Sequence, residues 1–235
     1  MDSNIYWVGG SKGGVGKSMV AMALIDYLCR RGHKPFLIEC DTSNPDCVKS
    51  YAKEVETQVI GAQSVNLDEK EGWEVLTDIC ASHAGPVVIN TAARNNDSVA
   101  RNGWYLTQGA AELGRPIVTL WVVNRQRDSL ELLKQFQEAL SQWGGESKVH
   151  VLRNLYFGDE NKFELYANSV LRASVEAAGG LSLNFPEMSD RISDAVYSHR
   201  LSLSRAEKEL SFGLRVGFKH WREQADRVFQ SAAVG

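Results

Sequence analysis

The sequence predicts an α/β fold, a single doubly wound and mostly parallel sheet flanked by helices. Short runs rich in β-branched residues alternate with segments of helical periodicity, which is the pattern of βαβ units. Several runs are apolar without alternation, as expected for strands covered on both faces. With 235 residues the chain is long enough to bury one core, and we expect a single domain over residues 1–235.

Six segments carry the strand pattern. The expected strands are Ile5 to Val8, Pro35 to Cys40, Val87 to Asn90, Ile117 to Val123 and Val149 to Asn154, with a weaker one at Leu181 to Phe185. Residues 50–68 have no clear period and receive no predicted element.

Four segments carry a helical pattern. Ser18 to Arg31 stops at Gly32, a common C-terminal breaker, and Glu71 to Ala81 and Ser129 to Trp143 are amphipathic. Residues 206–232 are expected to form a C-terminal amphipathic helix whose apolar stripe docks on the core; a membrane-surface or partner-binding helix is the alternative. The stripe consists of Leu210, Leu214, Phe218, Trp221, Ala225 and Val228.

The formal net charge of −3 gives no global reason to expect nucleic-acid binding. The charge is uneven, because Arg200 to Gly235 holds seven Lys/Arg against four Asp/Glu and so carries +3, while the rest carries −6. A solvated helix surface or a modest basic face explains this excess.

Cys29, Cys40, Cys47 and Cys80 show no C-x-x-C spacing and are expected to be reduced and mostly buried. The first residues lack a basic signal-like region, and no run approaches the ~20 apolar residues that span a bilayer. We therefore expect a cytoplasmic location without integral membrane association.

The most informative segment is Gly10 to Ser18, G-S-K-G-G-V-G-K-S, which follows an apolar run and opens a helix. This is the context of a phosphate-binding loop: glycines let successive N–H groups point at an anion, and the helix adds the positive end of its dipole. Lys17 is expected to reach the β- and γ-phosphates, and Ser18 to ligate Mg²⁺. The expected nucleotide contacts from this segment are Ser11, Lys12, Gly13, Gly14, Val15, Gly16, Lys17, Ser18 and Met19.

The strict pattern G-x-x-x-x-G-K-[ST] is missed by one residue, because Ser11 stands where it requires glycine. Lys12 restores the specificity: K-G-G-x-G-K-[ST] resembles the deviant Walker A motif of the ParA/MinD family of nucleotide-switched ATPases. The resemblance implies ATP and Mg²⁺ as cofactors. It also implies a dimer that closes on ATP, with Lys12 reaching the phosphates of the partner subunit.

Asp41 follows the second expected strand and should face the same crevice as Lys17, since ligands lie beyond the carboxyl ends of parallel strands. In the resembling family this strand ends in D-x-D, and the second aspartate, matched by Asp41, helps position Mg²⁺ and the attacking water. Glu39 replaces the first aspartate. The resemblance thus names Lys12, Lys17 and Asp41 as catalytic; for Asp41, a turn-starting residue is the alternative.

Asn90 ends the third expected strand, where family members have the Walker B aspartate that holds a magnesium-bound water. An amide offers a neutral oxygen in place of a carboxylate, so we expect slow hydrolysis. Ser18, Asp41 and Asn90 form the expected metal set.

Two further positions match residues that hold the adenine in the family. Asn154 ends the strand Val149 to Asn154, and Pro186 lies in a loop after the weaker strand. An amide can both donate to and accept from a base, so Asn154 is chemically suitable, while an asparagine ending a strand in a turn is the alternative.

The chain looks most like the members encoded by conjugative and mobilisable plasmids, the TraL and StbB kind. The supporting segments are Arg153-Asn154-Leu155-Tyr156-Phe157-Gly158, Lys162-Phe163-Glu164 and Phe185-Pro186-Glu187. This resemblance implies a role in plasmid DNA transfer, positioning or stability, with a protein partner from the same system. Non-specific DNA binding is a further expectation, with Arg215, Lys219 and Arg222 as candidate contacts.

A phosphate-binding loop occurs in proteins of three other functional classes. A P-loop kinase for a small metabolite would need a lid with catalytic arginines, for which Arg125 and Arg127 are candidates. A non-hydrolysing nucleotide-gated scaffold is compatible with Asn90. The iron–sulfur branch that shares the motif needs cluster cysteines late in the chain, and no cysteine follows Cys80.

Overall fold

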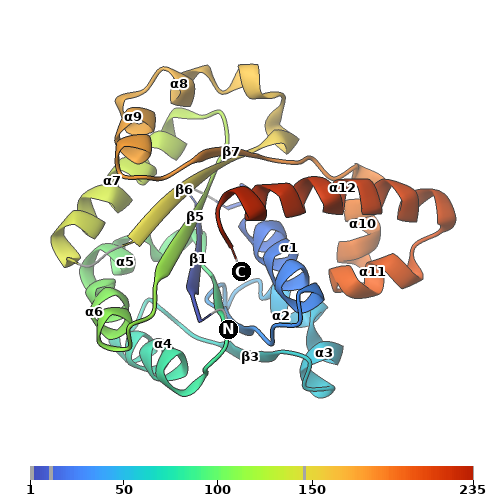
Figure 1. The fold of residues 1–235 in the computed structure, drawn as a ribbon, viewed down its shortest axis with the longest axis horizontal. Helices are drawn as coiled ribbons and strands as arrows, with labels where there is room; N and C mark the ends of the chain where they lie inside the picture. The colour runs from blue at the N-terminus through green and yellow to red at the C-terminus, as the bar shows by residue number, and fades with distance from the viewer. Residues whose placement is uncertain (1–2, 11–12, 145–146, 235) are drawn as a thin grey trace.

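A computed structural model describes residues 3–10, 13–144 and 147–234, which build a seven-stranded sheet covered by helices on both faces (Figure 1). The strand order is β3-β2-β4-β1-β5-β6-β7, and every neighbouring pair is parallel. β1 lies between β4 and β5, so the chain moves to one side of β1 first and to the other side later. The predicted fold class, a single doubly wound parallel sheet, is confirmed.

The strands are β1 Ile5–Gly10, β2 Phe36–Glu39, β3 Gly61–Ser64, β4 Val87–Asn90, β5 Ile117–Val123, β6 Ser147–Asn154 and β7 Ser182–Phe185. The helices of the first half are α1 Lys17–Arg30, α2 Asp46–Ser50, α3 Ala52–Glu56, α4 Lys70–Ser82, α5 Asn96–Asn102, α6 Trp104–Glu112 and α7 Arg127–Trp143. Those of the second half are α8 Glu164–Ala167, α9 Val170–Ala177, α10 Asp190–Ser198, α11 Leu203–Glu209 and α12 Phe212–Ser231.

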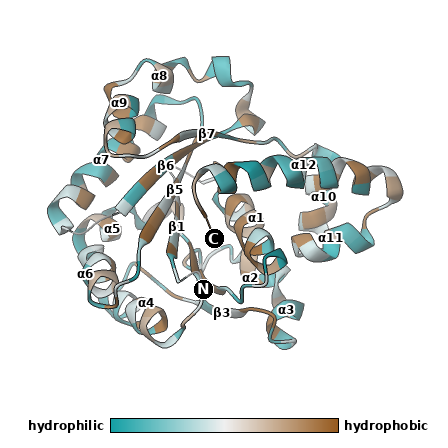
Figure 2. Ribbon diagram, in the orientation of Figure 1, coloured by the Kyte–Doolittle hydropathy of each residue, from teal (hydrophilic) through white to brown (hydrophobic). Residues whose placement is uncertain are grey.

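Two hydrophobic clusters lie on opposite faces of the sheet. One packs α1 and α12 against alternate residues of the strands, with Tyr6, Leu24 and Phe229 fully buried. The other lies under α4, α6 and α7 and contains Trp7, Trp73 and Leu133. Figure 2 shows the apolar residues gathered on the central strands and α1, as a sheet covered on both faces requires.

All six expected strands are present, with ends shifted by at most a few residues. β3 was not predicted, because its sequence Gly-Ala-Gln-Ser has neither β-branched residues nor alternation. It pairs with β2 at the edge of the sheet, and Gly61 leaves room for the ring of Phe36. Tertiary pairing, and not local propensity, forms this strand.

The C-terminal segment differs from the single helix expected over residues 206–232. It consists of α11 and α12, separated at Leu210, whose backbone is extended (φ −67°, ψ 146°). Leu210 is itself buried, so the apolar stripe continues across the break and conceals it. The expected docking is confirmed, since Phe218, Trp221, Ala225 and Val228 lie in the core beside α1.

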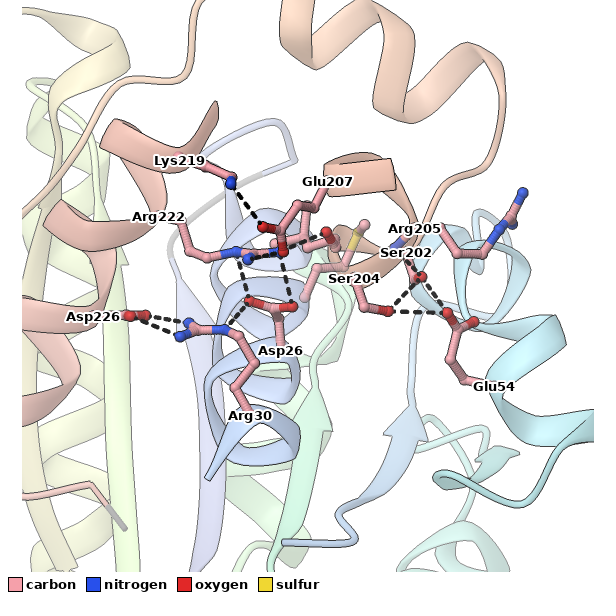
Figure 3. A network of polar contacts seen from close by, with 12 residues as sticks. Asp26, Arg30, Glu54, Ser202, Ser204, Arg205, Glu207, Lys219, Arg222 and Asp226 are labelled. Atoms are coloured by element: carbon pink, nitrogen blue, oxygen red, sulfur yellow. Dashed lines mark hydrogen bonds and ion pairs between the residues drawn. The ribbon is translucent and has the colours of Figure 1, made fainter. Parts of the chain in front are cut away.

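A charged network fixes α12 to α1 (Figure 3). Asp26 on α1 is 1% exposed and forms ion pairs with Arg222 Nε at 3.2 Å and Arg30 Nε at 2.9 Å. Arg30 also pairs with Asp226 of α12, and Arg222 Nη1 lies 2.6 Å from Glu207 of α11. The helix that begins at the glycine-rich loop is therefore held by charge as well as by apolar packing.

The cysteines agree with the expectation of free, mostly buried thiols: Cys40, Cys47 and Cys80 are buried and Cys29 is half-buried. Among the described residues, no helix has the length and apolar character to cross a membrane.

Candidate functional site

The carboxyl ends of β1, β2, β4 and β6 bring the predicted site residues together. β1 ends at Gly10, the glycine-rich loop follows, and α1 begins at Lys17. Ser11 and Lys12, two of the expected nucleotide contacts, lie outside the described residues. The other residues of the loop and of the first helical turn lie at the predicted end of the sheet.

Two glycines of the loop have backbone angles that other residues rarely adopt. Gly14 has φ +78°, and Gly16, which precedes α1, has φ +104°. A Cβ at Gly16 would also overlap the side-chain amide of Asn154. The sequence uses glycine where the loop turns and where β6 approaches it.

The N-terminus of α1 lies at the end of the glycine-rich loop. Among the described residues no side chain caps it, and the Val20 backbone N–H donates to Gly16 O at 3.0 Å. The preceding N–H groups, those of Lys17, Ser18 and Met19, therefore lie at the positive end of a 14-residue helix. This is the geometry in which a helix binds phosphate.

Lys17 is buried at the base of the loop. Burial lowers its pKa to about 8, and the nearby Asp41 carboxylate opposes that effect. An ammonium that has lost most of its hydration gains more from an anionic ligand than an exposed one does. Lys17 and Asp41 are thus near enough to interact electrostatically, as the strand order predicts.

Asp41 begins a turn after β2. Its Oδ1 accepts hydrogen bonds from Ser43 Oγ at 2.6 Å and from the Asn44 backbone at 3.1 Å. This is the turn-starting geometry weighed as the alternative. The turn occupies Oδ1 and keeps the carboxylate beside Lys17.

Glu39 is a buried acid that the expected site did not include. It ends β2, is 0% exposed, and accepts hydrogen bonds from the Asp41 backbone (3.1 Å) and the Asn90 amide (2.9 Å). Burial raises its pKa to about 7, and these hydrogen bonds offset part of that effect. The signal was present in the sequence, since Glu39 stands at the first acidic position of the D-x-D pattern.

Two of the three expected metal residues, Ser18 and Asn90, are in contact. Asn90 Nδ2 lies 3.4 Å from Ser18 Oγ, while Asn90 Oδ1 is buried and has no hydrogen-bond donor among the described residues. No group of three His, Cys, Asp or Glu side chains in the described part of the chain could enclose a metal ion by itself. Mg²⁺ typically takes one or two protein oxygens together with phosphates and waters, so the residues present fit such an ion only beside a nucleotide.

Asn154 braces the loop. Its Nδ2 donates to Val15 O at 2.8 Å, and its Oδ1 accepts from Tyr156 N at 3.1 Å. One amide hydrogen and one lone pair remain for a ligand. Asn154 is therefore both a strand end in a turn and a neighbour of the loop.

A cavity of about 250 Å³ opens beside the loop and collects the expected base-binding positions. Gly14, Gly16, Met19, Asn154 and Pro186 line it, together with Tyr156 and Tyr197. The Pro186 carbonyl accepts a hydrogen bond from Trp221 of α12 at 3.0 Å, which fixes this side of the cavity. Residues that are far apart in the sequence thus line one concave surface, which presents both apolar side chains and an amide group.

The structure corrects one expectation about the basic residues of α12. Arg222 is buried against Asp26 and Glu207, so it cannot reach DNA. Lys219 forms an ion pair with Glu207 at 3.3 Å. Arg215 is half-buried, with its guanidinium over the Phe212 ring. Two of the three candidate DNA contacts, Lys219 and Arg222, are thus engaged in ion pairs within the fold. Arg127, a candidate kinase arginine, forms an exposed ion pair with Glu131.

Comparison with known proteins agrees with this geometry. Protein MobD of Acidithiobacillus ferrooxidans is 52% identical over 231 residues and covers 98% of both chains. Protein TraL of Escherichia coli is 26% identical over 162 residues, 66% of this chain and 65% of its own. A Borrelia burgdorferi protein described as a plasmid partition protein, solved with AMPPNP, has a TM-score of 0.65 at 13% identity and covers 97% of this chain and 98% of its own, a likeness of fold.

The family model that describes the CobQ/CobB/MinD/ParA nucleotide binding domain matches residues 6–170, from β1 to the start of α9. This range includes the glycine-rich loop, Asp41, Asn90 and Asn154, and it covers more than half of the chain. The chain therefore belongs to the CobQ/CobB/MinD/ParA family of nucleotide-binding domains.

Proposed function

We propose that this protein is an ATP- and Mg²⁺-dependent molecular switch with weak ATPase activity, which acts in plasmid DNA transfer, positioning or stability. In this proposal the whole chain works as one nucleotide-binding domain in the cytoplasm. Its ATP-bound form is a homodimer that engages a protein partner from the same plasmid system, DNA, or both.

One arrangement supports the proposal. Gly14 and Gly16 have left-handed backbone conformations, and they are followed by the N-terminus of α1, which no described side chain caps, and by the buried Lys17. In the proposed complex, backbone N–H groups of the loop and of α1 hold the phosphates, and Lys17 neutralises their charge. The cavity beside Asn154 and Pro186 receives the base. The similarity to MobD and TraL supports the plasmid-associated role.

Ser18, Asp41 and Asn90 are the proposed holders of Mg²⁺, which when bound would shield the charge between the β- and γ-phosphates. Asp41, held by its turn next to Lys17, would orient the attacking water. Because Asn90 supplies a neutral oxygen, we expect slow hydrolysis. The same substitution favours a second candidate, a nucleotide-gated scaffold that does not hydrolyse ATP.

Lys12 distinguishes a switching dimer from a monomeric enzyme. Across a closed dimer its ammonium would share the triphosphate charge with Lys17 of the other subunit, so that closure would require the γ-phosphate. The proposal therefore predicts a change of mass that depends on the nucleotide.

The test is size-exclusion chromatography with light scattering, without ligand, with Mg²⁺ and ADP, and with Mg²⁺ and AMPPNP. The proposal predicts that the wild-type protein is a dimer only in Mg²⁺ and AMPPNP. It predicts that Lys12→Ala is a monomer in all three conditions. A wild-type monomer throughout, or a Lys12→Ala dimer with AMPPNP, would contradict the switch. Phosphate release from ATP would separate the weak ATPase from the scaffold, and phosphoryl transfer to a metabolite would favour the kinase.

A further inference from the structure

Glu39 and Asn90 face each other across the β2–β4 pair. They are register partners, and the Asn90 amide nitrogen donates to Glu39 Oε1 at 2.9 Å. Both side chains are buried, Glu39 at 0% and Asn90 at 1% exposure. An acid and an amide therefore form one unit at the carboxyl ends of two neighbouring strands.

The carboxyl group of Glu39 has no ion pair with a basic side chain in the described part of the chain. It accepts hydrogen bonds from the backbone N–H groups of Asp41 and Cys47 and from the side-chain amide of Asn90. A buried carboxylate is costly unless it is neutralised by a proton, a basic group or a metal ion. Among the described residues, no basic side chain pairs with Glu39 to compensate a negative charge there.

The surroundings of Glu39 indicate which cation this is. Glu39 Oε1 accepts from Asp41 N at 3.1 Å, and its partner Asn90 lies 3.4 Å from the Ser18 hydroxyl. Asp41, Asn90 and Ser18 are the three proposed magnesium holders. Glu39 contacts two of them directly and reaches the third through one amide.

The amide orientation follows from the same contact. Asn90 Nδ2 donates to Glu39 Oε1 and lies 3.4 Å from Ser18 Oγ, so the NH₂ group faces both residues and the amide oxygen faces away from them. That oxygen is the buried acceptor that has no donor among the described residues.

We propose that Glu39 supplies the buried negative charge of the magnesium site and that Asn90 transmits it to Ser18, so that the pair replaces a carboxylate at position 90. Glu39 is a positioning residue in this arrangement, acting through Asn90 and Asp41. The inference rests on the proposed nucleotide-dependent function.

A charge swap tests the pair. Glu39→Gln removes the charge, Asn90→Asp places two acids side by side, and the double variant Glu39→Gln/Asn90→Asp moves the charge across the strand pair while keeping one donor and one acceptor. The measurement is the affinity for a fluorescent ADP analogue in Mg²⁺ and in EDTA. Their ratio, the magnesium increment, isolates the ion from any general loss of nucleotide binding.

We expect Glu39→Gln to lower the magnesium increment about tenfold or more, the scale seen when partners of metal ligands are removed. The double variant should recover most of the increment, whereas Asn90→Asp alone should not raise it. Glu54→Gln is the matched control, because it removes another buried carboxylate, one that bonds Ser202 of the segment before α11, and it should leave the increment unchanged.

A Glu39→Gln protein with the wild-type increment would overturn the inference, and so would a double variant no better than the weaker single variant. If Glu39→Gln does not fold, as judged by circular dichroism, the folded double variant decides by its increment. If the wild-type protein binds no nucleotide in either condition, the proposed function itself fails. If the wild-type protein binds the nucleotide and the Glu39 and Asn90 variants leave the magnesium increment unchanged, this inference is contradicted but the proposed function is not.

Discussion

Arg222 of α12 lies against Asp26 of α1, with Nε and Oδ2 3.2 Å apart and both side chains buried. Burial raises the pKa of Asp26, and the neighbouring Arg222 and Arg30 oppose that effect. A carboxylate in this position depends on its guanidinium partners for compensation. The contact attaches the last helix of the chain to the helix that begins at the glycine-rich loop.

Replacing Arg222 should therefore destabilise the fold strongly. We expect Arg222→Ala to lower the free energy of unfolding by about 3 kcal/mol, because it leaves Asp26 buried with one basic partner fewer. Urea denaturation measures the change. Arg172→Ala is the control, since Arg172 forms an exposed pair with Glu176, and it should leave the midpoint unchanged. Equal midpoints for the two variants would contradict the role given to Arg222.

Gly16 and Gly13 provide a matched pair within the loop. Gly16→Ala should lower the free energy of unfolding by about 1–3 kcal/mol, because φ at this position is +104° and the new Cβ would overlap the Asn154 amide. A Cβ at Gly13 would meet no described atom within 4 Å, so Gly13→Ala should cost much less. Thermal unfolding of the ligand-free proteins compares them, and equal losses would argue against the described loop conformation.

Asn154 should contribute equally to the affinity for different nucleotides. Asn154→Ala removes the bonds to Val15 O and Tyr156 N that brace the loop, so affinity for ADP and GDP should fall in parallel. Competition titration with both nucleotides checks this expectation. If only ADP binding weakened, Asn154 would instead be a reader of the base, as the family resemblance implies.

Nucleotide affinity should depend on pH through Lys17. Its pKa of about 8 in the free protein means that the ammonium begins to lose its proton there, while bound phosphates favour the protonated form. Affinity in EDTA should thus be level below about pH 8 and fall by up to tenfold per pH unit above it. Calorimetry across this range should show proton uptake at high pH. Lys17→Met should bind weakly with a level profile, and a level wild-type profile would contradict the lowered pKa.

Much of this architecture was predictable because the signals were local. The apolar runs of β1, β4 and β5 and the glycine punctuation before α1 specify their elements directly. Two features were not predicted: β3 forms by pairing at an edge of the sheet, and the helix breaks at Leu210, which is itself a buried residue of the apolar stripe. Neither leaves a periodic signal in the sequence.

The site was predictable to the extent that it is a motif. The loop, Lys17 and Asp41 follow from spacing and strand order. The partnership of Glu39 with Asn90 depends on the register of two strands 51 positions apart, and the brace from Asn154 to Val15 spans 139 positions. Contacts between residues so far apart in the sequence depend on the folded sheet, and no local sequence pattern predicts them.

The central claim is that the loop before α1 binds a nucleoside triphosphate, and calorimetric titration of AMPPNP with Mg²⁺ into the purified protein tests it most directly. The account predicts saturable binding at one site per chain, lost in Lys17→Ala although that variant remains folded. Absence of binding to the wild-type protein, or undiminished binding to folded Lys17→Ala, would contradict it.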